Sequence, residues 1–430
     1  MMIEKTIKII LPTAVGCLML GACADEITSG TESAQTAVNI DLHIPELPDG
    51  AEVLEQFYTF KNVSTGESEE FSARQEIMLM PGLYDVEYTA RVFVRDAAET
   101  TLRANRQSVN ISGETFTLSL EAYNNIESDD LIIAEVFYTG TLQPSGNSYT
   151  GDDYIKLYNN SDHVIYADGL TIFESKFLTT AKYEYSPDII SEAMTVQALY
   201  TIPGSGKEVA VNPGEYLLIC DTGIDHRQAN PNSFDLTGAA FEWYDVSSNP
   251  KVMDIDGPVD NLDKWYCYTQ SYWMLHNRGF KAYGIARIPL DRDTYLRDYW
   301  YDYDYVQETV VGSFPMSQSA YKLPNEWISD VVMCSVPSAY AWQVCVPSLD
   351  SGWTSCGEID NDKNRYFRSV RRKLLYIAPD GRAVLQDTNN STADFNRDCV
   401  PSEVELQHSA TDAAGTPATV VTYDGVTPIE

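Results

Sequence analysis

The feature that most constrains this fold is an alternation of apolar and polar side chains at every second residue. It covers residues 86–94, with Asp85, Glu87 and Arg91 among the residues on the polar side, and a second run covers residues 38–44. Successive side chains of a strand point to opposite faces of its sheet. This period therefore predicts antiparallel sheets with one buried and one solvated face.

Short strand signals separated by turn residues continue along most of the 430-residue chain, 44% of which is hydrophobic. They predict an all-β protein with two immunoglobulin-like β-sandwich domains in tandem. We place the N-terminal sandwich at residues 37–123 and the second at 130–408, with a large insertion at about 225–322. Residues 23–36 read as an acidic tether and residues 409–430 as a flexible C-terminal tail.

The N-terminus has the pattern of an export signal. A basic start precedes an apolar run at residues 9–20, which is too short to span a bilayer as a helix, since a span needs about 20 residues. The run ends in Leu20-Gly21-Ala22-Cys23, which resembles a bacterial lipobox. The resemblance implies that residues 1–22 are a lipoprotein signal peptide and that Cys23 is acylated. Acyl chains would then anchor the protein in the outer membrane.

An acidic pair, Asp25 and Glu26, follows the lipobox directly. It resembles the surface-export signal of Bacteroidota lipoproteins. The resemblance implies that the protein is carried to the outer leaflet and faces the cell exterior.

Charge and cysteine content narrow the functional classes. Asp and Glu number 63 against 29 Lys and Arg, a formal charge of −34, which repels phosphate backbones and excludes nucleic acid as a partner.

With Cys17 removed and Cys23 acylated, six cysteines remain, and their 15 pairings stay open. None stands in a CxxC motif. They are Cys220, Cys267, Cys334, Cys345, Cys356 and Cys399.

Catalytic spacings are missing from the sequence. Its five histidines stand too far apart for the usual zinc motifs, and no GxSxG sequence occurs. A protein that is not an enzyme is therefore our prediction. A carboxylate-dependent hydrolase of glycans or esters stays open as the alternative, because that chemistry needs only two suitably placed acids.

Calcium is the one cofactor that the sequence suggests. Asp254, Asp256 and Asp260 supply alternating carboxylates of the kind that calcium prefers. The alternative is a solvated acidic loop, which an acidic protein is expected to contain.

The densest aromatic segments lie in the predicted insertion, and either packing or ligand contact accounts for them. Tyr299, Tyr301, Tyr303 and Tyr305 share one face of an expected strand, while Trp300, Asp302 and Asp304 share the other. Aromatic rings suit core packing, but they also stack on sugars or peptide side chains. Our candidate contacts for a glycan or peptide ligand are Trp265, Trp273, Trp300, Tyr301 and Tyr303.

Several segments resemble known sandwich families. Residues 62–66 and 81–86 resemble prealbumin-like and carboxypeptidase-regulatory domains. Other segments resemble the lamin-tail fold, although Lys156 stands where that pattern has an acidic residue. These lamin-tail segments are residues 131–136, 152–160, 167–172, 211–219, 323–332, 368–373 and 386–395.

In this arrangement the chain resembles a Bacteroidota surface lipoprotein family of unknown function, with a small N-terminal sandwich and an expanded lamin-tail-like domain. The resemblance implies a non-catalytic accessory of a TonB-dependent nutrient uptake system, which captures a ligand or docks onto the transporter. A structural protein of the envelope is the remaining alternative.

Overall fold

The structure is a computed structural model that describes residues 35–44, 47, 51–93, 100–125, 129–309, 311–378 and 380–419. The chain divides into two compact units between residues 125 and 126. Cys23, Asp25 and Glu26, with the predicted signal peptide, lie outside the described residues. In the described ranges, no helix has the length and apolar character needed to cross a membrane.

The described part of the first unit contains a three-stranded sheet in the order β4-β1-β7 and a five-stranded sheet in the order β3-β2-β5-β6-β8. The strands are β1 (Thr36–His43), β2 (Glu52–Asn62), β3 (Ser68–Ser72), β4 (Ile77–Leu79), β5 (Gly82–Phe93), β6 (Thr100–Ile111), β7 (Thr115–Glu121) and β8 (Tyr123–Asn125). β1 pairs with β7 in parallel and with β4 antiparallel.

Strand β5 confirms the alternation that the sequence predicts. Val86, Tyr88, Ala90 and Val92 are at most 2% exposed, whereas Glu87 between them is only partly buried. The buried members pack into one apolar cluster with residues of β1, β2, β6 and β7. Val94, which closes the predicted run, lies outside the described residues.

The second unit is built on two larger sheets. One has six strands in the order β18-β17-β12-β9-β24-β27, and the other has the order β21-β22-β15-β14-β20-β23, with β19 also paired to β15. The strands of the first are β9 (Ile132–Phe137), β12 (Tyr154–Tyr158), β17 (Tyr216–Cys220), β18 (Phe241–Glu242), β24 (Ser369–Arg372) and β27 (Phe395–Cys399). Those of the second are β14 (Leu170–Ser175), β15 (Ala193–Thr201), β19 (Asp263–Cys267), β20 (Ala282–Arg287), β21 (Trp300–Thr309), β22 (Gly312–Pro324) and β23 (Ile328–Met333).

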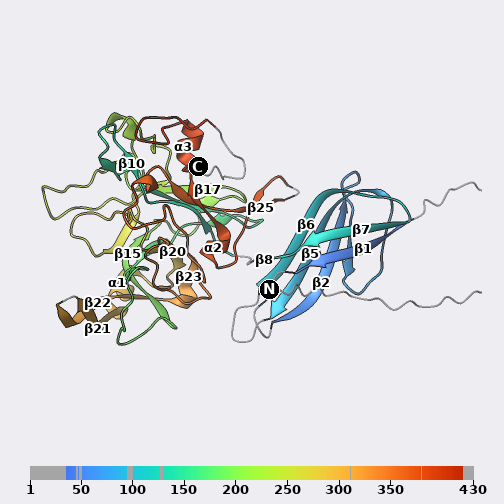
Figure 1. Ribbon diagram of the computed structural model, residues 1–430, viewed down its shortest axis with the longest axis horizontal. Helices are drawn as coiled ribbons and strands as arrows, with labels where there is room; N and C mark the ends of the chain where they lie inside the picture. Colours follow the sequence, from blue (N-terminus) through green and yellow to red (C-terminus); the bar gives the residue numbers. More distant parts are fainter. Residues whose placement is uncertain are drawn as a thin grey trace, which may run out of the picture. The chain divides into compact units, whose positions relative to one another are not determined.

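Short elements complete the unit. Three two-stranded sheets pair β10 (Thr141–Leu142) with β11 (Ser148–Tyr149), β13 (Ile165–Tyr166) with β16 (Ala210–Val211), and β25 (Leu374–Ile377) with β26 (Ala383–Leu385). The helices are η1 (His226–Gln228), α1 (Arg292–Asp298), η2 (Asn325–Trp327), η3 (Lys363–Arg365), α2 (Ser391–Asp394) and α3 (Ser402–Gln407). Figure 1 shows α1, α2 and α3 among the strands.

The inner strands of both large sheets are covered on both faces, and β9, β12, β14 and β15 are buried along their whole length. In β15, Ala198 and Tyr200 face the cluster shared with the six-stranded sheet, whereas Val196 and Leu199 face a separate cluster on the other side. All nine residues of β15 are buried. A strand buried on both faces carries apolar residues on both of them, and not only at alternate positions. The predicted all-β sandwich class is confirmed.

The segment at about 225–322, which we predict as an insertion, contributes strands to the body of the sandwich. It supplies β19, β20, β21 and nearly all of β22 to the seven-stranded sheet. β20 lies between β14 and β23, and five of its six residues are buried. Removing this segment would therefore remove all or nearly all of four of the seven strands and leave β23 without its partner.

The C-terminal segment is also ordered further than we predicted. Ala418 is buried beside Val404, and its N–H donates to the carbonyl of Ser409 at 2.9 Å. Asn232 donates through its side-chain amide to the carbonyl of Ala413. A flexible tail therefore does not begin at residue 409. Residues 420–430 lie outside the described residues.

Candidate functional site

Two of the five predicted contact residues belong to the interior. Trp273 is 0% exposed and lies 5.0 Å from Tyr200 and 4.9 Å from Trp243 between ring centroids. We call these three rings the core trio. Tyr303 is 2% exposed, and its hydroxyl donates to Oε1 of Gln318 at 3.0 Å. Because both side chains are enclosed, their prediction as ligand contacts is wrong.

The other three predicted contacts have different surroundings. Trp265 is half-buried and packs on Tyr295, with the centroids 5.9 Å apart. Trp300 is 44% exposed on the outer face of β21. Tyr301 points to the opposite face, where it lines a hollow. The structure therefore does not bring these predicted residues together in one site.

The predicted calcium ligands do not converge. Asp254 accepts hydrogen bonds from the backbone of Asp245 and Ile255, and Asp256 accepts one from the side chain of Asn261. Asp260 is exposed. In the described parts of the chain, no three His, Cys, Asp or Glu side chains are grouped to hold a metal ion. The carboxylates make hydrogen bonds within a local loop, and the calcium site stays a prediction.

A hollow of about 70 Å³, which we call the aromatic pocket, lies on the inner face of β21. Its floor comes from β15 and β21, and its walls come from the loop between β14 and β15 and from the loop after β23. Ser186 of the first loop exchanges two backbone hydrogen bonds of 2.9 Å with Asp304 of β21. This pairing fixes the loop against the edge of the sheet.

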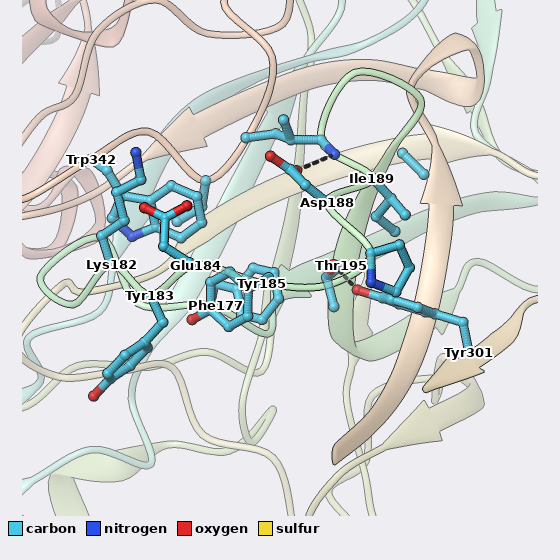
Figure 2. A pocket seen from close by; sticks show the side chains of 14 residues that line it. Phe177, Lys182, Tyr183, Glu184, Tyr185, Asp188, Ile189, Thr195, Tyr301 and Trp342 are labelled. Carbon is cyan, nitrogen blue, oxygen red and sulfur yellow. Dashed lines mark hydrogen bonds between the residues drawn. The ribbon is translucent and has the colours of Figure 1, made fainter. Parts of the chain in front are cut away.

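Five aromatic side chains line the aromatic pocket. One is Tyr183, and the other four, which we call the pocket rings, are Phe177, Tyr185, Tyr301 and Trp342. Phe177 and Tyr185 stack with centroids 3.9 Å apart and planes at 19°, and Figure 2 shows them at the centre of the site. Tyr185 also lies 5.9 Å from Trp342, nearly parallel to it. Such offset stacks hold each ring in place.

Hydrogen bonds set the orientation of the two outer rings. The Tyr301 hydroxyl lies 2.5 Å from Oγ1 of Thr195, as Figure 2 shows. The indole N–H of Trp342 donates to the carbonyls of Leu178 and Ala181 at 2.9 and 3.0 Å. Burial raises the pKa of Tyr301 to about 12, so its hydroxyl stays neutral at physiological pH.

The rim of the pocket is charged. Lys182, Glu184 and Asp188 are exposed there. The Lys182 Nζ lies 5.9 Å from the centroid of the Trp342 ring, within the range of a cation–π contact. Asp188 accepts a hydrogen bond from the backbone N–H of Ile190 through one oxygen.

Most of these residues were missed from the sequence. Tyr183 and Tyr185 alternate with Lys182 and Glu184, a period-two aromatic pattern that marks a half-exposed extended segment. That signal was available. Trp342 gave no comparable signal, since only the fold brings the loop after β23 beside the loop after β14.

Outside the pocket, a group of polar residues looks reactive but is enclosed. The ammonium of Lys156 donates to Oγ of Ser402 at 2.6 Å and pairs with Glu403 at 2.6 Å, while the Ser402 hydroxyl donates to Glu135. Ser402 is 8% exposed and begins α3. The contacts pin α3 to β9 and β12, and they explain why a lysine is accommodated at position 156.

Arg372 links the two large sheets. It is 3% exposed, pairs with Asp330 of β23 at 2.6 Å and with Asp387 at 3.0 Å, and donates to the carbonyl of Ile133. Asp394 accepts hydrogen bonds from the Thr388 backbone and side chain. A buried cation with several carboxylate partners holds the turn at residues 386–395 against the sheets. Asp330, Asp387 and Asp394 therefore have a structural role.

The six described cysteines are free thiols. All but Cys267 are buried. Burial raises the pKa of Cys399 to about 12, and the pKa of Cys334 also rises for the same reason. Thiols held in the neutral form are poor nucleophiles, which gives them no evident part in catalysis.

Comparisons with known proteins agree with the fold. Residues 212–402 match the family model described as a protein of unknown function (DUF4876). No curated protein matches the chain. The crystal structure of a DUF4876 family protein from Bacteroides thetaiotaomicron is similar, with a TM-score of 0.56 and 20% identity, over 85% of this chain and 96% of that one. Residues 212–402 thus match a DUF4876 family domain, and the fold of the chain is similar to that of a Bacteroides protein of that family.

Proposed function

We propose that this protein is a lipid-anchored protein of the outer cell surface that captures a ligand in its aromatic pocket without catalysing a reaction. In this role it serves a TonB-dependent nutrient uptake system, either by presenting the ligand or by docking onto the transporter. The observation that carries the proposal is the pocket itself, with four rings held around a hollow of about 70 Å³.

The pocket has the properties of a capture site. Its rings come from three separate segments, and hydrogen bonds hold Tyr301 and Trp342, so little freedom is lost when a ligand stacks on them. The residues that line it include no histidine, serine or cysteine, and its two carboxylates, Glu184 and Asp188, are exposed at the rim. The sequence Leu20-Gly21-Ala22-Cys23 supports the lipid anchor, and Asp25 and Glu26 support the position at the cell exterior.

Capture is tested with Tyr185→Ala, which removes the central ring, and with Tyr166→Ala as a matched control at an exposed tyrosine away from the pocket. Purified protein is mixed with a panel of glycans and peptides, and both depletion and breakdown are measured. The proposal expects depletion that Tyr185→Ala abolishes and Tyr166→Ala retains, with the ligand recovered intact. Recovery of cleaved ligand would contradict capture without catalysis.

The anchor is tested with Cys23→Ala, which should move the protein from the detergent phase to the aqueous phase. Alanine at both Asp25 and Glu26 should preserve acylation but protect the protein from external protease. A Cys23→Ala protein that still partitions with lipid would contradict the anchor.

A further inference from the structure

The rim and wall of the aromatic pocket carry a specific electrostatic pattern. Glu184 and Asp188 place two exposed carboxylates at the rim, against one ammonium from Lys182. The whole chain has a formal charge of −34. Both the local and the overall field therefore attract a cation.

The pocket already holds a cation of the chain itself. The Lys182 Nζ lies 5.9 Å from the Trp342 ring centroid, beside the Tyr185 stack. The electron-rich face of an indole attracts an ammonium or guanidinium group, and this attraction grows when the group is partly desolvated. The position over Trp342 is therefore one that a lysine side chain can reach and occupy.

The size of the pocket restricts what enters it. Pockets that enclose a whole small molecule measure about 300–1,000 Å³. The aromatic pocket measures about 70 Å³, which admits one end group of a larger ligand. The rest of that ligand must lie outside, across the exposed rim.

We propose that the aromatic pocket binds the cationic end group of a basic peptide side chain, stacked on Trp342 and paired with Glu184 or Asp188. The ammonium of lysine and the guanidinium of arginine share the required chemistry. The incoming side chain displaces Lys182 from its place over the ring. This inference rests on the proposed capture function and adds the class of ligand to it.

The first test uses blocked peptides, acetyl-Gly-X-Gly-amide, where X is lysine, arginine or the uncharged isostere norleucine. Calorimetric titration of the purified protein should detect the lysine or arginine peptide and give at least about tenfold weaker binding with norleucine. Equal binding of norleucine would overturn the inference, because the site would then be apolar and not cation-selective.

Two sets of variants separate the pocket from general charge attraction. Glu184→Gln combined with Asp188→Asn should weaken binding about fivefold or more. The matched pair Asp260→Asn and Glu326→Gln removes the same charge at exposed positions elsewhere and should change binding less than twofold. Equal losses in both pairs would overturn the inference, because long-range attraction would explain the binding.

Lys182 supplies a test of opposite sign. Lys182→Gln removes the resident cation and should strengthen binding of the lysine peptide about threefold or more. Lys207→Gln makes the same charge change at an exposed residue outside the pocket and should have little effect. Weaker binding in Lys182→Gln would contradict the displacement.

A glucosamine trisaccharide is the remaining probe, because it is a cationic glycan and not a peptide. Its binding in the absence of peptide binding would overturn the peptide assignment while the capture function stands. If neither cationic probe binds but a neutral glycan is captured in a Tyr185-dependent manner, this inference fails and the proposed function does not.

Discussion

Two groups of aromatic rings in the second unit share a composition but differ in their relation to solvent. The core trio of Tyr200, Trp243 and Trp273 is fully enclosed between the two large sheets. The pocket rings, among them Tyr185 and Trp342, are only half-buried around a hollow. The content of tryptophan and tyrosine therefore does not distinguish a packing role from a contact role.

The difference comes from what surrounds each group. Trp273 meets apolar side chains of both large sheets, so all sides of its ring are covered. Tyr185 lies in a loop that is paired to the edge strand β21 of the seven-stranded sheet, and its side chain is only half-buried there. Loops carried by a rigid scaffold are where binding residues concentrate, whereas rings between sheets stabilise the fold.

The largest expected effect is on the core trio. Trp273→Ala should lower the free energy of unfolding by about 3–5 kcal/mol, because it leaves a large cavity in a well-packed interior. Urea denaturation measures the loss. Tyr185→Ala in the pocket should lose clearly less, since its ring is partly solvated already. Equal losses in the two variants would remove the distinction between the two groups.

A second prediction concerns a buried acid of the interior. Burial raises the pKa of Asp152 to about 7, although Ser233 and Thr141 donate hydrogen bonds to it. Between about pH 4 and 7 the folded chain keeps a proton that the unfolded chain releases. The stability that Asp152 contributes is therefore complete at low pH and is lost as the pH rises, by up to about 1.4 kcal/mol per pH unit.

Asp152→Asn cannot titrate and should remove that part of the pH dependence. Urea denaturation of both proteins at pH 5 and pH 8 measures it. If the free energy of unfolding changes between pH 5 and pH 8 by the same amount in the variant, Asp152 does not titrate in this pH range.

A smaller effect is expected at Tyr303, which joins the pocket rings to the interior. Tyr303→Phe keeps the ring but removes its hydrogen bond to Gln318, so we expect a loss of about 0.5–1.5 kcal/mol. Ligand capture should be retained, because the residue does not line the hollow. Loss of capture with unchanged stability would show that the Tyr303 hydroxyl contacts the ligand.

The smallest effect is expected at Trp300, on the exposed face of β21. Trp300→Ala should change stability by no more than about 1 kcal/mol, since nearly half of the side chain is already solvated. Capture by the pocket should be unaffected, because Trp300 and Tyr301 point to opposite faces. A strong loss of capture would place a contact surface on the outer face instead.

The fold was largely predictable because its signals are local. The alternation in β5 and the turns between strands depend on neighbours in the sequence, and the structure confirms the all-β class. The turn at residues 386–395 also depends on near neighbours, since Asp394 and Asn390 accept hydrogen bonds from the backbone N–H groups of Thr388 and Ala393. The position of β20 between β14 and β23 was not predictable, because these pairing partners lie far from it along the chain.

The candidate site was predictable only in part. The alternation of tyrosines in β21 correctly separates an inner from an outer face, and Tyr301 lines the pocket. Sequence spacing cannot tell which inner tyrosine is covered, and Tyr303 is enclosed while Tyr301 is not. Trp342 belongs to the site because it packs on Phe177 and Tyr185, which lie far from it along the chain. A local sequence pattern cannot predict such a long-range contact.

The most direct test of the account compares Trp342 and Trp273 in one sample of the full chain. The seven tryptophans are replaced by 5-fluorotryptophan, and their ¹⁹F resonances are assigned with single Trp→Phe variants. Lysine and arginine peptides and a neutral glycan are then added in turn. The account predicts that at least one probe shifts the Trp342 resonance while the Trp273 resonance stays in place. A Trp342 resonance that no probe moves, or a Trp273 resonance that shifts equally, would contradict it.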